Sequence, residues 1–135
     1  MRFADTNILL YSISLVPGEA RKADMAITLL AASDLCLSVQ VLQEFYVQAT
    51  RPSHPSPLSH RDAAAFIATW LRFPVQSLTV PVLQAALAAK ERWQISYWDA
   101  AIIEAARATG CHEVLSEDLH HGQDYGGVRV TNPFL

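Results

Sequence analysis

Cysteine is scarce in this chain of 135 residues. Its two cysteines, Cys36 and Cys111, lie far apart and belong to no Cys-x-x-Cys or Cys/His ligand spacing. The pattern therefore indicates neither a disulfide framework nor a zinc site. We expect two reduced, buried thiols in a reducing compartment.

Long apolar segments are also missing. No apolar run approaches the ~20 residues that are needed to span a bilayer, and the first residues show no basic-then-apolar leader. Repeats and low-complexity segments are absent as well. These features predict a cytoplasmic protein without a membrane segment.

Basic residues are outnumbered by acidic ones. Ten Lys and Arg stand against thirteen Asp and Glu, which gives a net charge of −3, and the only lysines are Lys22 and Lys90. This balance argues against a monomer that holds nucleic acid through bulk positive charge.

Apolar sequence is plentiful. Hydrophobic residues make up 51% of the chain and charged residues 17%, a balance typical of packed rather than disordered proteins. The length fits one domain, so we expect residues 1–135 to form a single domain. The simplest interpretation of Trp70, Trp93 and Trp98 is that all three belong to the core.

The hydrophobic pattern alternates short strands with helices. Strands are expected at 2–4, 35–38, 75–79, 113–115 and 128–130. Between them, we expect a short helix after residues 5–7 and longer helices at 19–32, from Ser38, from Ser59, at 81–93 and from Ser96 to Gly110. The alternation predicts an α/β fold of three layers, with helices flanking a short, mostly parallel sheet. Ligands of such sheets bind beyond the carboxyl ends of the strands.

Four acidic residues are expected near that edge. Asp5 and Asp118 follow predicted strands, whereas Glu44 and Asp99 lie on predicted helices beside them. Asp99 shares the core-facing side of its helix with Ile102, and a carboxylate in that position is costly unless something satisfies it. Clustered carboxylates without His or Cys suit Mg²⁺ or Mn²⁺ better than zinc.

Each acid also has an ordinary structural explanation. Asp5 fits an N-cap, and Glu44 fits a solvated helix glutamate. Asp99 fits a capping box with Ser96, and Asp118 fits a turn. These alternatives stay open for the single residues, while the four together favour a site.

Four segments of the chain resemble the signature segments of PIN-domain proteins, and most closely those of VapC-type toxins from bacterial toxin–antitoxin pairs. They are residues 5–11, 37–45, 96–103 and 115–123, and residues 128–134 resemble the C-terminus of that group. The resemblance covers essentially the whole chain. It implies the three-layer PIN-like fold.

The resemblance also implies a metal-dependent endoribonuclease that uses Mg²⁺, with Mn²⁺ as a substitute. Asp5, Glu44, Asp99 and Asp118 match the family's acidic quartet, which binds metal and performs catalysis through a metal-activated water. Thr6, Asn7 and Ser116 are expected to orient these acids. The partners implied are an RNA substrate, a cognate antitoxin and a second copy of the chain in a homodimer.

Contacts to the phosphates of RNA are expected from arginines near the proline-rich loop at 51–59. The candidates are Arg51, Arg61 and Arg72, with His54 and His60 nearby; a solvated loop and helix face is the alternative. Contributions from Glu117, His120, His121 and Gln123 are left open, with Glu117 interpreted as a solvated neighbour of Asp118.

Three other functions compete with this one. A phosphatase of the haloacid-dehalogenase type would need a second acid two residues after Asp5, where this chain has Asn7. A PIN nuclease of RNA maturation and a non-catalytic PIN-like module that binds RNA or a partner are the remaining alternatives. Retention of all four acids argues against the non-catalytic module.

Overall fold

The computed structural model describes all 135 residues, and it forms an α/β fold around one sheet. Every neighbouring pair of its five strands is parallel, in the order β3-β2-β1-β4-β5. The strands are β1 (Arg2–Ala4), β2 (Leu35–Ser38), β3 (Val75–Gln76), β4 (Glu113–Leu115) and β5 (Arg129–Thr131). The predicted fold class is confirmed, and β1 lies at the centre of the sheet.

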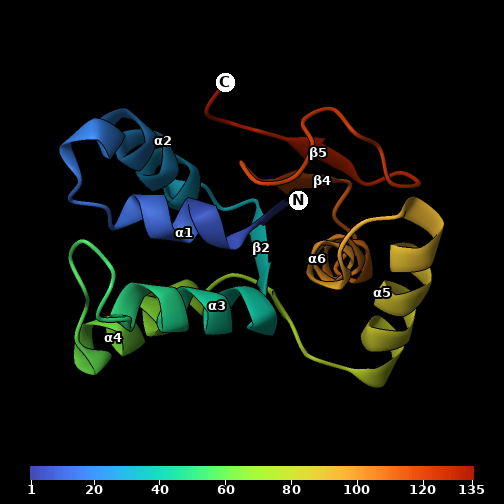
Figure 1. Cartoon of the computed structure of the whole chain (residues 1–135), viewed down its shortest axis with the longest axis horizontal. Coiled ribbons are helices and arrows are strands. Elements are labelled where there is room, and N and C mark those ends of the chain that lie inside the picture. The colour runs from blue at the N-terminus through green and yellow to red at the C-terminus, as the bar shows by residue number, and fades with distance from the viewer.

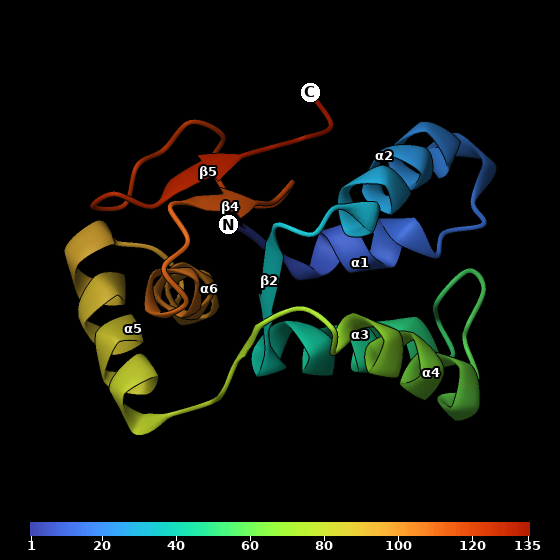
Figure 2. The ribbon, with the colours of Figure 1, turned by 180° about the vertical axis from the view of Figure 1, so that it is seen from behind.

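Helices flank this sheet in three consecutive pairs (Figures 1 and 2). The pairs are α1 (Thr6–Ser12) with α2 (Ala20–Ala31), α3 (Val39–Thr50) with α4 (His60–Trp70), and α5 (Val80–Trp93) with α6 (Tyr97–Ala108). A single 3-10 turn, η1 (Pro17–Glu19), precedes α2. None of the helices has the length and apolar character needed to cross a membrane.

Serine caps fix where three of the helices begin. The hydroxyls of Ser38, Ser59 and Ser96 each accept a hydrogen bond from the backbone N–H three residues further on, which satisfies one of the free donors of the first helical turn. The C-terminal end of α6 is followed by Gly110, whose φ of 79° suits glycine. The predicted boundaries of these helices are therefore confirmed.

The core lies between the sheet and the helix faces that cover it. Its largest fully buried side chains include Phe3, Phe45, Ile8, Leu9, Leu35, Leu37 and Ile103. Trp70 is buried and meets Phe45 edge-to-face, with ring centroids 4.7 Å apart. Trp93 is half-buried. Of the three tryptophans predicted to be core, these two pack as expected.

Trp98 is a correction, because 64% of it is exposed. It lies in the first turn of α6, and this helix runs antiparallel to the strands as the connection that returns to β4. Its first turn therefore lies at the carboxyl edge of the sheet, where the helix faces a hollow rather than the strands. Helical periodicity predicts which side of α6 faces the sheet, but it does not predict where along α6 the sheet ends and leaves that side uncovered.

Two strands and the cysteines also differ from expectation. β3 ends at Gln76 instead of residue 79, since the chain beyond it is exposed, and β5 is displaced by one residue. The two cysteines, predicted to be reduced thiols far apart in the sequence, have their sulfur atoms side by side in the core. Cys36 lies on β2 and Cys111 lies two residues before β4. Both strands are neighbours of β1, so residues 75 positions apart meet in the core.

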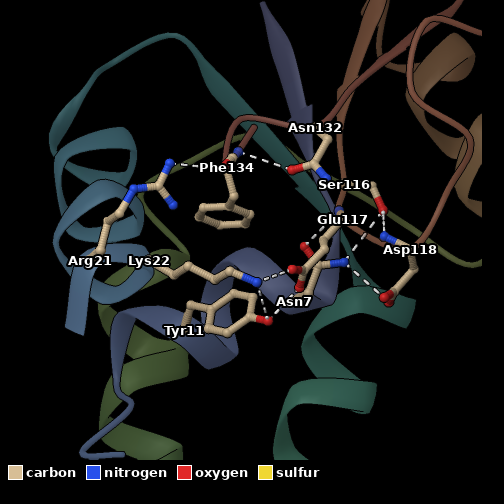
Figure 3. A network of polar contacts seen from close by, with 9 residues as sticks. All are labelled: Asn7, Tyr11, Arg21, Lys22, Ser116, Glu117, Asp118, Asn132 and Phe134. Carbon is tan, nitrogen blue, oxygen red and sulfur yellow. Dashed lines mark hydrogen bonds and ion pairs between the residues drawn. The ribbon is translucent and has the colours of Figure 1, made fainter. Parts of the chain in front are cut away.

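A polar cluster ties the segment after β4 to α1 and α2 (Figure 3). The Glu117 carboxylate pairs with the ammonium of Lys22 and accepts a hydrogen bond from the hydroxyl of Tyr11. The Phe134 ring packs edge-to-face on Tyr11 with centroids 5.0 Å apart, and the Phe134 carbonyl accepts a hydrogen bond from Arg21 at 2.8 Å. The C-terminal segment therefore braces the same helices that hold Glu117.

This bracing predicts that Phe134→Ala destabilises the fold. Phe134 is buried against Tyr11, and truncation of a buried phenylalanine typically lowers the free energy of unfolding by about 3 kcal/mol. Urea unfolding measures the change. Leu135→Ala is the control, because Leu135 is 79% exposed and its truncation should change stability by less than ~0.5 kcal/mol. Equal stability of the two variants would contradict the bracing role of Phe134.

Candidate active site

The side chain of Asp5 is the most buried acid at the carboxyl edge of the sheet, with 7% of the residue exposed. Asp5 directly follows β1 and is the N-cap of α1. One carboxylate oxygen accepts a hydrogen bond from the Thr6 N–H at 2.7 Å, and the other accepts one from the Ser116 hydroxyl at 2.7 Å. The N-cap interpretation is therefore right for Asp5, and it leaves the carboxylate at the site as well.

Burial of Asp5 has an electrostatic consequence. Desolvation raises the pKa of its carboxyl from 3.8 to about 6, although the hydrogen bonds from Ser116 and Thr6 lower it. The negative charges of Asp118 and Glu44 raise the pKa further. A neighbouring cation would offset these contributions, because its charge favours the ionised carboxylate and lowers its pKa.

Ser116 organises the segment that follows β4. Its fully buried hydroxyl donates to Asp5 and accepts hydrogen bonds from the N–H groups of Asp118 at 3.1 Å and Leu119 at 3.3 Å. One hydroxyl thus connects the acid after β1 with the turn that carries the acid after β4.

Asn7 holds the same turn from the side of α1 (Figure 3). Its amide nitrogen donates to a carboxylate oxygen of Asp118 at 3.2 Å, and its amide oxygen accepts from the Glu117 N–H at 3.3 Å. The positions of Asn7 and Ser116 next to Asp118 are those expected of residues that orient an acid.

Glu44 reaches the site from α3. Its two carboxylate oxygens accept hydrogen bonds from the Thr6 hydroxyl at 2.8 Å and from the Gln40 amide at 3.0 Å. Sequence reasoning missed Gln40, although it precedes Glu44 by four residues and so lies on the same side of the helix.

Asp99 reaches the site from the first turn of α6. Its backbone N–H donates to the Ser96 hydroxyl at 3.1 Å, but its carboxylate makes no return bond to the cap, so only half of a capping box is present. The carboxylate instead lines the hollow that the other acids line. The sequence pattern gave no means of choosing between these two roles.

All four predicted acids line one hollow of about 390 Å³. Glu19 and Glu117 line it too, and no lysine or arginine does; the full set of charged and imidazole side chains is Asp5, Glu19, Glu44, His54, Asp99, Glu117 and Asp118. No three of these side chains are drawn together closely enough to form a ready metal centre. The donor set nonetheless fits a hard divalent cation, because it offers carboxylate oxygens and no competing positive side chain.

Glu117 is the one acid of this hollow with a cation of its own. Burial alone would raise its pKa, but the hydrogen bonds from Lys22 and Tyr11 and the charge of Lys22 outweigh burial and lower it. This interaction engages Glu117 away from the other acids, so Glu117 is an ion-paired residue rather than the solvated neighbour we expected.

The predicted RNA-contacting arginines are not gathered together. Arg51 lines a second hollow beside the acidic one, together with Glu44 and Gln48. Arg72 donates to the carbonyl of Leu30 at 2.6 Å, so its role is structural, and Arg61 is exposed on α4 and lines neither hollow.

The histidines are similarly dispersed. His54 lines the acidic hollow, while His60 is hydrogen-bonded to the Tyr46 hydroxyl. His121 accepts a hydrogen bond from the Asn132 N–H. His120, His121 and Gln123 do not line the hollow.

Comparison with known proteins finds one matching family and several solved structures of similar fold. The model of the PIN domain matches residues 2–123. No curated protein matches the chain. Among solved structures, the Mycobacterium tuberculosis toxin VapC20, described as cleaving the sarcin–ricin loop, is similar with a TM-score of 0.67 and 23% identity over 87% of this chain and 92% of that one.

Two toxin–antitoxin assemblies are also similar. A chain of the Klebsiella pneumoniae complex matches with a TM-score of 0.68 and 17% identity over 98% of both chains. A chain of the DNA-bound VapBC complex from Salmonella typhimurium matches with a TM-score of 0.65 and 19% identity over 96% of this chain and 95% of that one. At these identities the structures show a shared fold, and the match over residues 2–123 shows that the chain belongs to the PIN domain family.

Proposed function

We propose that this protein is a metal-dependent endoribonuclease and the toxin of a toxin–antitoxin pair. One observation carries the proposal: four acids from separate segments, Asp5, Glu44, Asp99 and Asp118, line a single hollow without a lysine or arginine. Such a site binds divalent cations and takes up a phosphodiester once they are present. Similarity to a toxin described as cleaving the sarcin–ricin loop supports RNA as the substrate.

The four acids are the proposed ligands of Mg²⁺, with Mn²⁺ as a substitute. When bound, the cation supplies Lewis-acid chemistry for hydrolysis of the phosphodiester bond. Ser116 and the Thr6 N–H hold Asp5 in place, the Thr6 hydroxyl and Gln40 hold Glu44, and Asn7 holds Asp118. These contacts fix three of the four carboxylates before any ligand arrives, which reduces the entropy lost on binding.

We also propose two protein partners, an antitoxin and a second copy of this chain. Toxin–antitoxin complexes among the similar structures support an antitoxin as partner. A homodimer is supported by the net charge of −3 and by an exposed apolar row on α5, formed by Val80, Leu83 and Leu87. Residues 1–135 are proposed to form one nuclease domain.

Cleavage of an RNA pool by the purified protein tests the nuclease directly. We expect cutting with Mg²⁺ or Mn²⁺, none with EDTA, and a loss of at least about 100-fold in Asp99→Asn, since even residues behind metal ligands contribute 10–100-fold. Asp62→Asn is the matched control: Asp62 has the same position after the Ser59 cap of α4 as Asp99 has after Ser96. Equal activity of Asp99→Asn and the parent would contradict the proposed metal site.

In the metal-free protein, the contribution of Asp5 to stability should fall as pH rises. Burial raises the pKa of the Asp5 carboxyl to about 6, so the folded state binds this proton more tightly than the unfolded chain. Its contribution is present below about pH 4 and is lost as pH rises through 6. Asp5→Asn should therefore gain on the parent in free energy of unfolding by about 2 kcal/mol between pH 4 and pH 8.

Urea unfolding in EDTA measures this difference at both pH values. Addition of Mg²⁺ at pH 8 should stabilise the parent and leave Asp5→Asn nearly unchanged. A gap between the two proteins that does not vary with pH would show that Asp5 is not held at a raised pKa.

The homodimer predicts a molar mass of twice the 14.9 kDa of one chain in light scattering. Leu83→Glu should shift the protein towards monomer, because a carboxylate would replace the apolar side chain in the middle of the exposed row on α5. Leu15→Glu, at an exposed position outside this row, should keep the parent mass. A monomer mass for the parent would exclude the dimer.

A further inference from the structure

Trp98 is exposed beside the acidic hollow, although an apolar side chain of this size is usually buried. Its neighbour in the chain is Asp99, and both line that hollow. The indole meets the Tyr97 ring edge-on, with centroids 5.1 Å apart and an interplanar angle of 73°. This contact with one neighbour leaves 64% of Trp98 accessible. The fold does not need Trp98 for its core, so the residue is available to a ligand.

A second hollow continues from the acidic one along α3. Its volume is about 470 Å³, and it shares Glu44, Gln48 and Trp98 with the acidic hollow. The other lining residues are Gln40, Gln43, Val47 and Arg51. The two hollows are therefore neighbouring parts of one surface, separated by side chains that belong to both.

The lining of the second hollow is dominated by amides. The amide of Gln40 is bound to Glu44, whereas those of Gln43 and Gln48 make no hydrogen bond within the protein. A free carboxamide offers both donors and an acceptor, which is the pattern needed to recognise the edge of a nucleobase. Arg51 adds the only positive charge, suited to a phosphate.

We propose that this second hollow is a subsite for one unpaired nucleobase, next to the phosphodiester that is cut. Trp98 stacks on the face of the base, Gln43 and Gln48 hydrogen-bond its edge, and Arg51 contacts the phosphate that follows. The inference rests on the proposed nuclease function, because it is the acidic hollow that fixes where the cut phosphodiester lies. It adds a residue that selects single-stranded RNA, since only an unpaired base exposes a face for stacking.

The chemistry of the hollow favours a nucleobase over a segment of a partner protein. An amphipathic helix docks through several apolar anchors in a hydrophobic groove, but Val47 is the one aliphatic side chain here. A stacking indole flanked by amides and one guanidinium matches the way proteins hold single strands.

The kinetic test compares Trp98→Ala, Trp98→Phe and the parent on single-stranded RNA with Mg²⁺. Loss of one stacked base should raise KM about tenfold in Trp98→Ala and leave kcat within about twofold. Phe should restore most of the KM, because it keeps an aromatic face. Leu78→Ala is the control, since Leu78 is 60% exposed and lines neither hollow.

Two further readouts do not depend on the rate of cutting. The first uses the Asp99→Asn variant, which should leave RNA intact. Titration of this variant with an RNA octamer of mixed sequence should quench its tryptophan fluorescence. The quenching should be lost when Trp98 is also changed to Phe. Sequencing of the cut sites should show that Gln43→Ala relaxes the base preference at one position beside the cut.

The outcomes separate the subsite from the nuclease. If the parent cuts RNA and Trp98→Ala has the same KM, the subsite is wrong and the nuclease stands. If no variant binds or cuts RNA, the subsite and the proposed function fail together. If Trp98→Ala weakens binding of a partner protein and leaves RNA binding unchanged, the hollow is a protein-docking site and the nucleobase subsite is overturned.

Discussion

The buried carboxylate of Asp5 depends on where β1 ends. β1 is the central strand, and the Asp5 N–H still donates to the carbonyl of Leu115 on neighbouring β4. The chain then turns into α1, so that the carboxylate caps the helix and receives the Ser116 hydroxyl from the next segment. The register of the sheet, the start of α1 and the position of Asp5 therefore depend on one another. A shift in any one of them would leave the Asp5 carboxylate buried without the hydrogen bonds from the Thr6 N–H and the Ser116 hydroxyl.

The other acids are arranged around Asp5 at an energetic cost to the metal-free fold. The negative charges of Asp118 and Glu44 disfavour the charged form of Asp5 and raise its pKa. The protein relieves this repulsion partly with neutral donors, namely Thr6, Asn7, Gln40 and Ser116. Neutral donors stabilise a carboxylate without removing its charge, so the negative charge of the hollow remains uncompensated and favours a cation.

Local rules of sequence predict much of this fold and part of the site. Serine followed three residues later by an acid predicts the starts of α4 and α6, because the cap bond involves only neighbouring residues. Acids that follow predicted strands are placed at the right edge, because parallel strands all end there. The sequence does not place Trp98 or Arg72 correctly, since exposure of the first and the bond of the second to the Leu30 carbonyl depend on where distant elements end.

The pairing of Cys36 with Cys111 and the partners of Glu117 have the same origin. Each joins segments that are far apart in the chain, and no spacing rule connects them. Lys22 is one of only two lysines in the chain, and its position on α2 places it beside Glu117. Without this ion pair, Glu117 would be a further unpaired carboxylate in the acidic hollow. One of the two lysines thus neutralises one of the carboxylates that line the acidic hollow.

Charge also links the two parts of the proposed active surface. Without a cation, the acidic hollow repels the phosphates of RNA, and Arg51 at its side is a single opposing charge. The net charge of −3 leaves no general attraction to overcome this repulsion. In the proposed nuclease, binding of metal and binding of RNA would therefore strengthen each other, because the ion that neutralises Asp5 would also let a phosphate approach it. In the proposed subsite, the uncharged contacts of Trp98, Gln43 and Gln48 would contribute affinity for RNA that the protein's own negative charge opposes, which gives the exposed tryptophan beside the acids a role.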